Sequence, residues 1–138
     1  MTDHYEHKID DKGRLFIPSD LRKELGEVFH VLILNDDCIN AYSGESWERL
    51  IDKVKTLPIR KQPKMMPLFA NASRCELDSQ GRFLLPQKLR SRIGLQKDVT
   101  VVGAGTLVQI WDTEKFNKVN EKESTPESLA ALLDELDF

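Results

Sequence analysis

Long apolar runs and cysteines are scarce in this sequence of 138 residues, and each scarcity excludes a class of protein. No apolar run approaches the roughly 20 residues that a membrane-spanning helix requires. The amino-terminal stretch "MTDHYEHKID" contains neither an apolar signal segment nor an arginine-rich amphipathic face. Only two cysteines are present, Cys38 and Cys75, which form no disulfide framework and suit a reducing cytosol. We therefore expect a cytoplasmic protein with no membrane partner, in which both cysteines are small buried side chains.

Motifs of catalysis and metal binding are also missing. No phosphate-binding glycine loop, catalytic Ser/His/Asp arrangement or catalytic motif of paired acidic residues stands out, so we expect no enzyme activity and no cofactor. His4 and His7 lie three residues apart, but no further histidine or cysteine accompanies them at ligand spacing. We therefore expect no metal site.

The net charge of −3 is unevenly distributed along the chain. Residues 112–138 hold eight acidic residues and three lysines, whereas residues 1–111 hold seventeen basic and fifteen acidic residues. Within this slightly basic body, residues 82–97 carry five basic residues and no acidic one. An acidic protein with such a distribution can still present one positive face to a polyanion.

The most informative feature present is an internal repeat. The stretch "HKIDDKGRLFIPSDLRKELG" aligns with "CELDSQGRFLLPQKLRSRIG" sixty-eight residues later, and seven of the twenty positions are identical. Self-similarity at a fixed period indicates that the architecture is built from two copies of one unit. The identical pairs are Asp10 and Asp78, Gly13 and Gly81, Arg14 and Arg82, Pro18 and Pro86, Leu21 and Leu89, Arg22 and Arg90, and Gly26 and Gly94.

Each half has the same predicted order of elements. A strand leads into a four-residue turn, where aspartate can cap the backbone and glycine supplies a positive φ. A second strand and a short helix from proline to glycine follow, with Ser19 as a candidate N-cap in the first half. Two β-branched strands and a closing helix complete the half, and Asp112 or Thr113 is the candidate cap of the second closing helix. In the first half, the predicted strands are 5–9, 14–18, 28–34 and 38–42, the turn is 10–13, and the helices are 18–26 and 47–54. In the second half, the predicted strands are 74–77, 82–86, 98–103 and 107–111, the turn is 78–81, and the helices are 86–94 and 113–119.

Neither half is large enough to bury a sizeable core alone, so we expect the two to fold together. The predicted fold is α+β and mainly β, a pseudo-symmetric barrel of two repeats with short helices. Its predicted parts are a first repeat at 4–54, a connecting segment at 55–73, a second repeat at 74–119 and an acidic helical tail at 120–138. The tail places four leucines on one helical face, which needs a groove on its own body or on a neighbour. These leucines are Leu129, Leu132, Leu133 and Leu136.

The doubled pattern Asp-x-x-Gly-Arg-x-x-x-Pro followed by Leu-Arg-x-x-x-Gly resembles the SpoVT-AbrB type of swapped-hairpin DNA-binding module. Two tandem copies over residues 4–116 are similar to the MraZ family. The resemblance implies a transcription regulator of the cytoplasm and nucleoid that binds double-stranded DNA at direct repeats upstream of the operon for cell division and cell-wall synthesis. It also implies a ring-shaped homo-oligomer, often an octamer, with Asp-x-x-x-Arg motifs placed around the ring.

The resemblance places that motif on Asp10 and Arg14 and again on Asp78 and Arg82. An arginine fixed at the start of a strand can present its planar fork to guanine O6 and N7 or to a phosphate. The aspartate either caps the turn or pairs with the arginine and holds it extended.

Lysines distinguish the two copies of the turn. Lys12 and Lys8 can add phosphate contacts in the first copy, whereas Gln80 stands at the position of Lys12 in the second. We therefore expect the first copy to do more of the DNA reading. Basic residues on the two short helices can contact DNA, a subunit interface or solvent; they are Arg22, Lys23, Lys88, Arg90 and Arg92.

Two other functions remain open at this stage. One is an antitoxin-like DNA binder that acts mainly through a partner protein, which the apolar face of the tail would suit. The other is an enzyme on a small barrel. The doubled repeat disfavours the first alternative, and the missing catalytic motifs disfavour the second.

Overall fold

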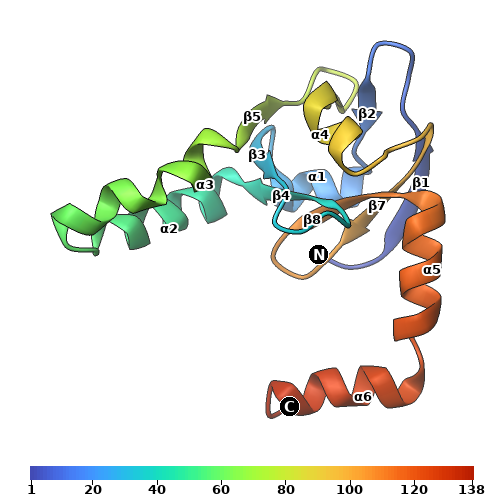
Figure 1. Cartoon of the computed structure of the whole chain (residues 1–138). Coiled ribbons are helices and arrows are strands. Elements are labelled where there is room, and N and C mark those ends of the chain that lie inside the picture. Colours follow the sequence, from blue (N-terminus) through green and yellow to red (C-terminus); the bar gives the residue numbers. More distant parts are fainter.

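The two repeats form one interlocked unit in the computed structural model, which describes residues 1–138. Each repeat runs strand, turn, short strand, short helix, hairpin and long helix, in the predicted order (Figure 1). The first repeat comprises β1 (His4–Lys8), β2 (Arg14–Phe16), α1 (Ser19–Leu25), β3 (Val28–Leu32), β4 (Ile39–Ser43) and α2 (Gly44–Lys55). The second comprises β5 (Ser73–Glu76), β6 (Arg82–Leu84), α4 (Gln87–Arg92), β7 (Asp98–Gly103), β8 (Val108–Asp112) and α5 (Thr113–Glu123).

The main sheet has six antiparallel strands in the order β1-β7-β8-β4-β3-β5. Its centre is the pair β4 and β8, one strand from each repeat, so the β3–β4 and β7–β8 hairpins are neighbours within the same sheet. The first strand of each repeat pairs with the hairpin of the other repeat: β1 with β7, and β5 with β3. Neither repeat can therefore complete its sheet without the other, and the expected α+β, mainly β and pseudo-symmetric class is confirmed.

A separate two-stranded ribbon ties the repeats together a second time. Strands β2 and β6 pair antiparallel, with Leu15 opposite Phe83. The ribbon continues at both ends through reciprocal backbone bonds, because Ile17 N donates to Gly81 O at 2.9 Å and Leu85 N donates to Gly13 O at 2.9 Å. The turn of each repeat is thus hydrogen-bonded to the strand that follows the turn of the other.

The core lies between the sheet, the ribbon and the short helices α1 and α4, and it contains 18 buried residues from both repeats. Phe29 on β3 and Phe83 on β6 meet edge to face with ring centroids 5.0 Å apart. Both rings are almost fully buried, so one aromatic pair joins the two repeats at the centre. Cys38 and Cys75 are buried free thiols, as expected, and burial raises the pKa of each to about 11.

The predicted helix caps are right in part. Helix α1 does begin after Pro18, but Ser19 is already helical and makes no capping bond. Helix α5 also lacks a side-chain cap, because tertiary contacts use both candidates: Asp112 accepts from Gln96 N at 3.0 Å and Thr113 bonds Thr100 at 2.8 Å. The Ser43 hydroxyl caps α2, a cap that the sequence prediction missed.

Two helical extensions leave the body on opposite sides (Figure 1). The first is an arm made of α2, the 3₁₀ helix η1 (Ile59–Met65) and α3 (Met66–Ala70). The second is α5 followed by α6 (Pro126–Glu135), whose start is capped by Thr125, because its hydroxyl accepts from Ser128 N at 3.2 Å. No helix in the structure is long and apolar enough to cross a membrane.

Candidate nucleic-acid interface

The first turn, residues 10–13, is organised by one carboxylate. Asp10 Oδ1 accepts hydrogen bonds from the backbone N–H groups of Lys12 at 3.0 Å and Arg14 at 2.8 Å. Gly13 N donates to Asp10 O at 2.9 Å, and the turn closes because Gly13 adopts a φ of 81°, which a glycine reaches without strain. The aspartate therefore caps the turn, as one of the two expected roles requires.

The other oxygen of Asp10 performs the second expected role. Oδ2 accepts from Arg14 Nε at 2.7 Å, which fixes the guanidinium while its two terminal nitrogens make no hydrogen bond within the chain. The backbone N–H of Arg14, together with its guanidinium, holds the pKa of Asp10 below its usual value. The carboxylate thus stays ionised, and Arg14 is oriented with its donor fork available to a ligand.

The second turn, residues 78–81, repeats this arrangement almost atom for atom. Asp78 Oδ1 accepts from Gln80 N at 2.9 Å and from Arg82 N at 3.0 Å. Asp78 Oδ2 accepts from Arg82 Nε at 3.3 Å, a longer bond than its counterpart in the first turn. Backbone donation from Arg82 again lowers the pKa of the aspartate.

The structure brings the two turns together, although sixty-eight residues separate them in the sequence. Figure 1 shows both turns at the top of the molecule, and strands β2 and β6, which follow them, pair with each other. Arg82 Nη1 lies 4.0 Å from Asp10 Oδ2, so an ion pair crosses from one turn to the other. Arg14 and Arg82 are each about one-third exposed, at 33% and 29% of their side chains. The two arginines therefore belong to one continuous, partly open site.

Two more arginines belong to this site, and sequence reasoning left their role undecided. Arg90, on α4, places its guanidinium against Gly13, and Arg22, on α1, places its guanidinium against Gly81. Each short helix thus covers the turn of the opposite repeat. Arg90 Nε is held by Leu85 O at 3.1 Å, whereas Arg22 stacks over the ring of Phe16 at 5.2 Å. The signal was already in the repeat, since Arg22 and Arg90 occupy identical positions.

These two arginines decide the charge of the site. Asp10 with Arg14, and Asp78 with Arg82, are neutral pairs, and a neutral pair attracts a polyanion only weakly. With Arg22 and Arg90 included, the site has four arginines and two aspartates, which is a net charge of +2. The formal charges of Asp11 and Lys12 sum to zero and leave this total unchanged. The surface is consequently positive where the free guanidinium nitrogens are presented.

The predicted lysines differ from each other in the structure. Lys12 is exposed, and its ammonium group takes part in no ion pair, so its charge is available to an anion. Lys8 lies on β1 opposite Asp98 and donates to its Oδ1 at 2.8 Å. Because both side chains are exposed, the Lys8 pair is weak and screened by salt, but it offsets the charge of the lysine.

The chain contains no cluster of three or more histidine, cysteine or acidic side chains that could hold a metal ion. His4 and His7 instead face separate aromatic rings, His4 near Phe116 at 5.0 Å and His7 near Phe16 at 5.2 Å between centroids.

Comparison with known proteins identifies the repeats. A family model described as "MraZ protein, putative antitoxin-like" matches twice, over residues 1–67 and 68–135. Curated proteins named "Transcriptional regulator MraZ" are similar over most of the chain. The one from Heliobacterium modesticaldum is 45% identical over 121 residues, which is 86% of this chain and 85% of that protein. Those from Thermoanaerobacter sp. (strain X514) and Acetivibrio thermocellus are each 41% identical, covering 100% and 91% of this chain and 99% and 91% of their own lengths.

Proposed function

The chain belongs to the MraZ family, and on that premise we propose that it is a transcription regulator that binds DNA through its paired Asp-x-x-x-Arg turns. A role in transcription regulation follows from the names that its relatives carry over nearly their whole lengths. The finer proposal is that the target is a set of direct repeats upstream of the operon for cell division and cell-wall synthesis. A homo-oligomeric ring, of which the octamer is the expected form, would present one double turn from each subunit.

The observation that carries this proposal is the way each aspartate holds its arginine. Asp10 engages only Nε of Arg14, so the end of the guanidinium, with its two terminal nitrogens, has no hydrogen-bond partner within the chain. That end matches the O6 and N7 acceptors of guanine in the major groove, and it also matches two oxygens of a phosphate. Because the turn is already rigid, little conformational entropy is lost when DNA binds.

The two copies of the turn are proposed to contribute unequally. The first has the shorter Asp–Arg bond, 2.7 Å against 3.3 Å, and only the first has a lysine with an unpaired ammonium group beside the motif. Arg82 is also drawn towards Asp10 of the other turn. The first copy, with Arg14 and Lys12, is therefore the main reader, and the second supports it. Lys8 is assigned a minor role, since DNA must compete with Asp98 for it.

Several weak contacts can still give useful affinity if a ring offers its double turns to successive DNA repeats. Once one double turn is bound, the next meets its repeat at a high effective concentration. Direct repeats would suit the rotational order of a ring better than inverted repeats would.

Fluorescence anisotropy on a labelled duplex with the promoter repeats, recorded over a salt series, tests the proposal. A bidentate arginine–base contact contributes about 1–3 kcal/mol of discrimination, so Arg14→Ala should weaken binding by about 5- to 150-fold and relax the preference at one base. Arg82→Ala should have a smaller effect, and Lys12→Ala should reduce the salt slope by about one unit without changing base preference.

A matched control is available on the arm, far from the turns in Figure 1. Arg60 is exposed on η1 and takes part in no ion pair, so Arg60→Ala removes the same charge elsewhere. It should bind the repeats within about twofold of the wild type under the same salt conditions. Equal binding by Arg14→Ala and the wild type, or binding without a salt slope, would show that these turns do not read DNA.

A further inference from the structure

Helix α6 carries an apolar face that nothing in its own chain covers. Every residue from 125 to 138 is exposed except Ser128, which is half-buried. Leu129, Leu132, Leu133 and Leu136 are exposed to 50%, 53%, 49% and 76%, and their spacing puts them on one side of the helix. A ten-residue helix is marginal in water by itself, so this apolar face needs a partner surface.

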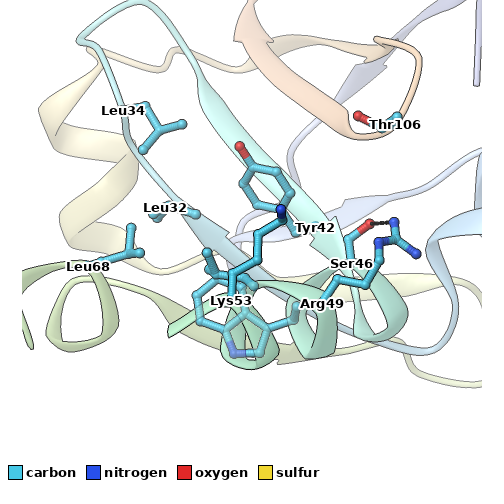
Figure 2. Close-up of a pocket in the computed structure, with 10 residues that line it drawn as sticks. Leu32, Leu34, Tyr42, Ser46, Arg49, Lys53, Leu68 and Thr106 are labelled. Carbon is cyan, nitrogen blue, oxygen red and sulfur yellow. Dashed lines mark hydrogen bonds between the residues drawn. The ribbon is translucent and has the colours of Figure 1, made fainter. Parts of the chain in front are cut away.

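A groove of suitable chemistry lies at the base of the arm. Figure 2 shows it between the β3–β4 connection and the arm, where Leu32, Leu34 and Leu68 approach Tyr42 from one side. This hollow has a volume of about 440 Å³, and the same three leucines also line a neighbouring hollow of about 520 Å³. The two hollows thus adjoin at these three leucines, and we refer to them together as the groove.

The charges of the helix and of the groove are opposite. The residues that line the two hollows include four basic side chains and no acidic one; they are Arg49, Lys53, Lys88 and Arg92. The segment 126–138 includes four acidic side chains and no basic one; they are Glu127, Asp134, Glu135 and Asp137. Arg49 and Arg92 already pair with Glu45 and Asp36, but Lys53 and Lys88 take part in no ion pair. An apolar stripe with acidic flanks thus matches an apolar groove with basic flanks.

The position of α6 favours a groove on another copy over the groove of its own chain. Helix α5 is fixed to the sheet, because Phe116 packs in a buried cluster with Trp111 and Cys38. Only Ser124 and Thr125 separate α5 from α6, and two extended residues span about 7 Å at most. Figure 1 shows α5 on the side of the body away from the arm, and α6 turning back beneath the body without reaching the arm. In its own chain the helix therefore lies apart from the groove.

We propose that α6 of one subunit docks in the groove formed by Leu32, Leu34 and Leu68 of a second copy of this chain. A contact between two different surfaces of the same chain is head-to-tail, and repeating it builds a closed ring or an open filament. The inference rests on the proposed function only in naming the contact that holds its ring together. DNA reading by the turns is a separate property with a separate test.

Light scattering coupled to size-exclusion chromatography measures the contact directly, on the full chain without DNA. The wild type should have several times the mass of one 15.9 kDa chain. Replacing two leucines on the stripe, in Leu132→Glu/Leu133→Glu, should reduce the mass to that of one chain. Ala131→Glu, on the opposite face of the same helix, should assemble as the wild type does.

The groove has its own variant and control. Leu34 is 58% exposed and lines both hollows, so Leu34→Glu should also give single chains without unfolding them, as circular dichroism can verify. Ile59→Glu makes the same change at an exposed residue of the arm outside the groove and should leave assembly intact. Lys53→Glu adds repulsion without touching the apolar face, and should raise the dissociation constant of assembly about tenfold or more at low salt.

A mixing experiment identifies the occupant. Leu34→Glu retains a usable α6, and Leu132→Glu/Leu133→Glu retains a usable groove, so an equimolar mixture should form one-to-one dimers and stop there. A single-chain wild type would overturn the proposal and favour a foreign partner. Assembly of Leu34→Glu alone would overturn it in favour of stripe-to-stripe pairing, and the absence of mixed dimers would also overturn it. A duplex with one repeat should bind all these variants equally, so the loss of DNA reading is recognised separately.

Discussion

Replacing Gly13 by alanine tests whether Arg90 holds the turn of the opposite repeat. A Cβ atom on Gly13 would lie 2.8 Å from Arg90 Nη2 and 3.1 Å from its Cζ, so the guanidinium must move. Gly105 is the matched control, because its φ of 78° is close to the 81° of Gly13, yet a Cβ atom there meets nothing within 4 Å. The difference between the two alanine variants therefore isolates the displacement of Arg90.

The expected magnitudes follow from these contacts. A left-handed backbone costs an alanine about 1–2 kcal/mol, which should be the whole effect of Gly105→Ala. Gly13→Ala also displaces a guanidinium that donates to Leu85 O at 3.1 Å, and a charged hydrogen bond is worth about 1.5–3 kcal/mol. Because the site is partly open to solvent, we take the lower half of that range and expect Gly13→Ala to cost about 2.5–4 kcal/mol in all.

A double-mutant cycle in urea, at one fixed protein concentration, measures the coupling. Once Arg90→Ala has removed the guanidinium, Gly13→Ala should cost only about 1–2 kcal/mol, which leaves a coupling energy of about 1.5–2 kcal/mol. If Gly13→Ala costs the same with and without Arg90, or no more than Gly105→Ala does, the guanidinium does not hold the turn. The contact of α4 with the turn of the opposite repeat would then contribute nothing measurable to stability.

Three further outcomes are expected. Phe83→Ala should destabilise the fold by about 3–5 kcal/mol, whereas Phe83→Leu should cost less than about 1.5 kcal/mol in the same urea titration. The pKa values of Asp10 and Asp78 are lowered by folding, so the contribution of these two carboxylates to the free energy of unfolding is present at neutral pH and is lost as the pH falls below about 4. A variant with asparagine at both positions should therefore be less stable at pH 7, and its stability should fall less steeply in acid. An unchanged dependence of stability on pH would contradict the hydrogen bonding. Cys38 and Cys75, buried and with pKa values near 11, should react with a thiol reagent at pH 7 only as fast as the protein opens, which rapid labelling of the native protein would disprove.

Local features were predictable because they depend on residues close together in the chain. The Asp10 turn is one example: an aspartate with free backbone N–H groups two and four residues ahead, and a glycine that permits positive φ, determine its shape wherever it occurs. The stop of α1 at Gly26, with a φ of 81°, is another. Helix starts were less predictable, since tertiary hydrogen bonds recruited Asp112 and Thr113 away from the end of α5.

Roles that depend on contacts between the repeats were harder to assign. Arg22 and Arg90 stand at matched positions, but the match does not reveal that each covers the turn of the other repeat. The charge of Lys8 is in the sequence, whereas its pairing with Asp98 depends on the register of β1 against β7. A strand register places residues ninety positions apart opposite each other, and no local pattern encodes that distance.

The doubled unit, the order of elements in each copy and the recurring aspartates and arginines could all be predicted from the amino-acid sequence, because repeats and short-range backbone hydrogen bonds depend on residues that are close together in the chain. Three features became visible only in the folded chain: the strands that the repeats exchange, the meeting of four arginines at one site, and the uncovered leucines of α6 together with a groove of matching chemistry. Burial and ion pairing depend on proximity in space, which follows from how two half-sheets complete each other.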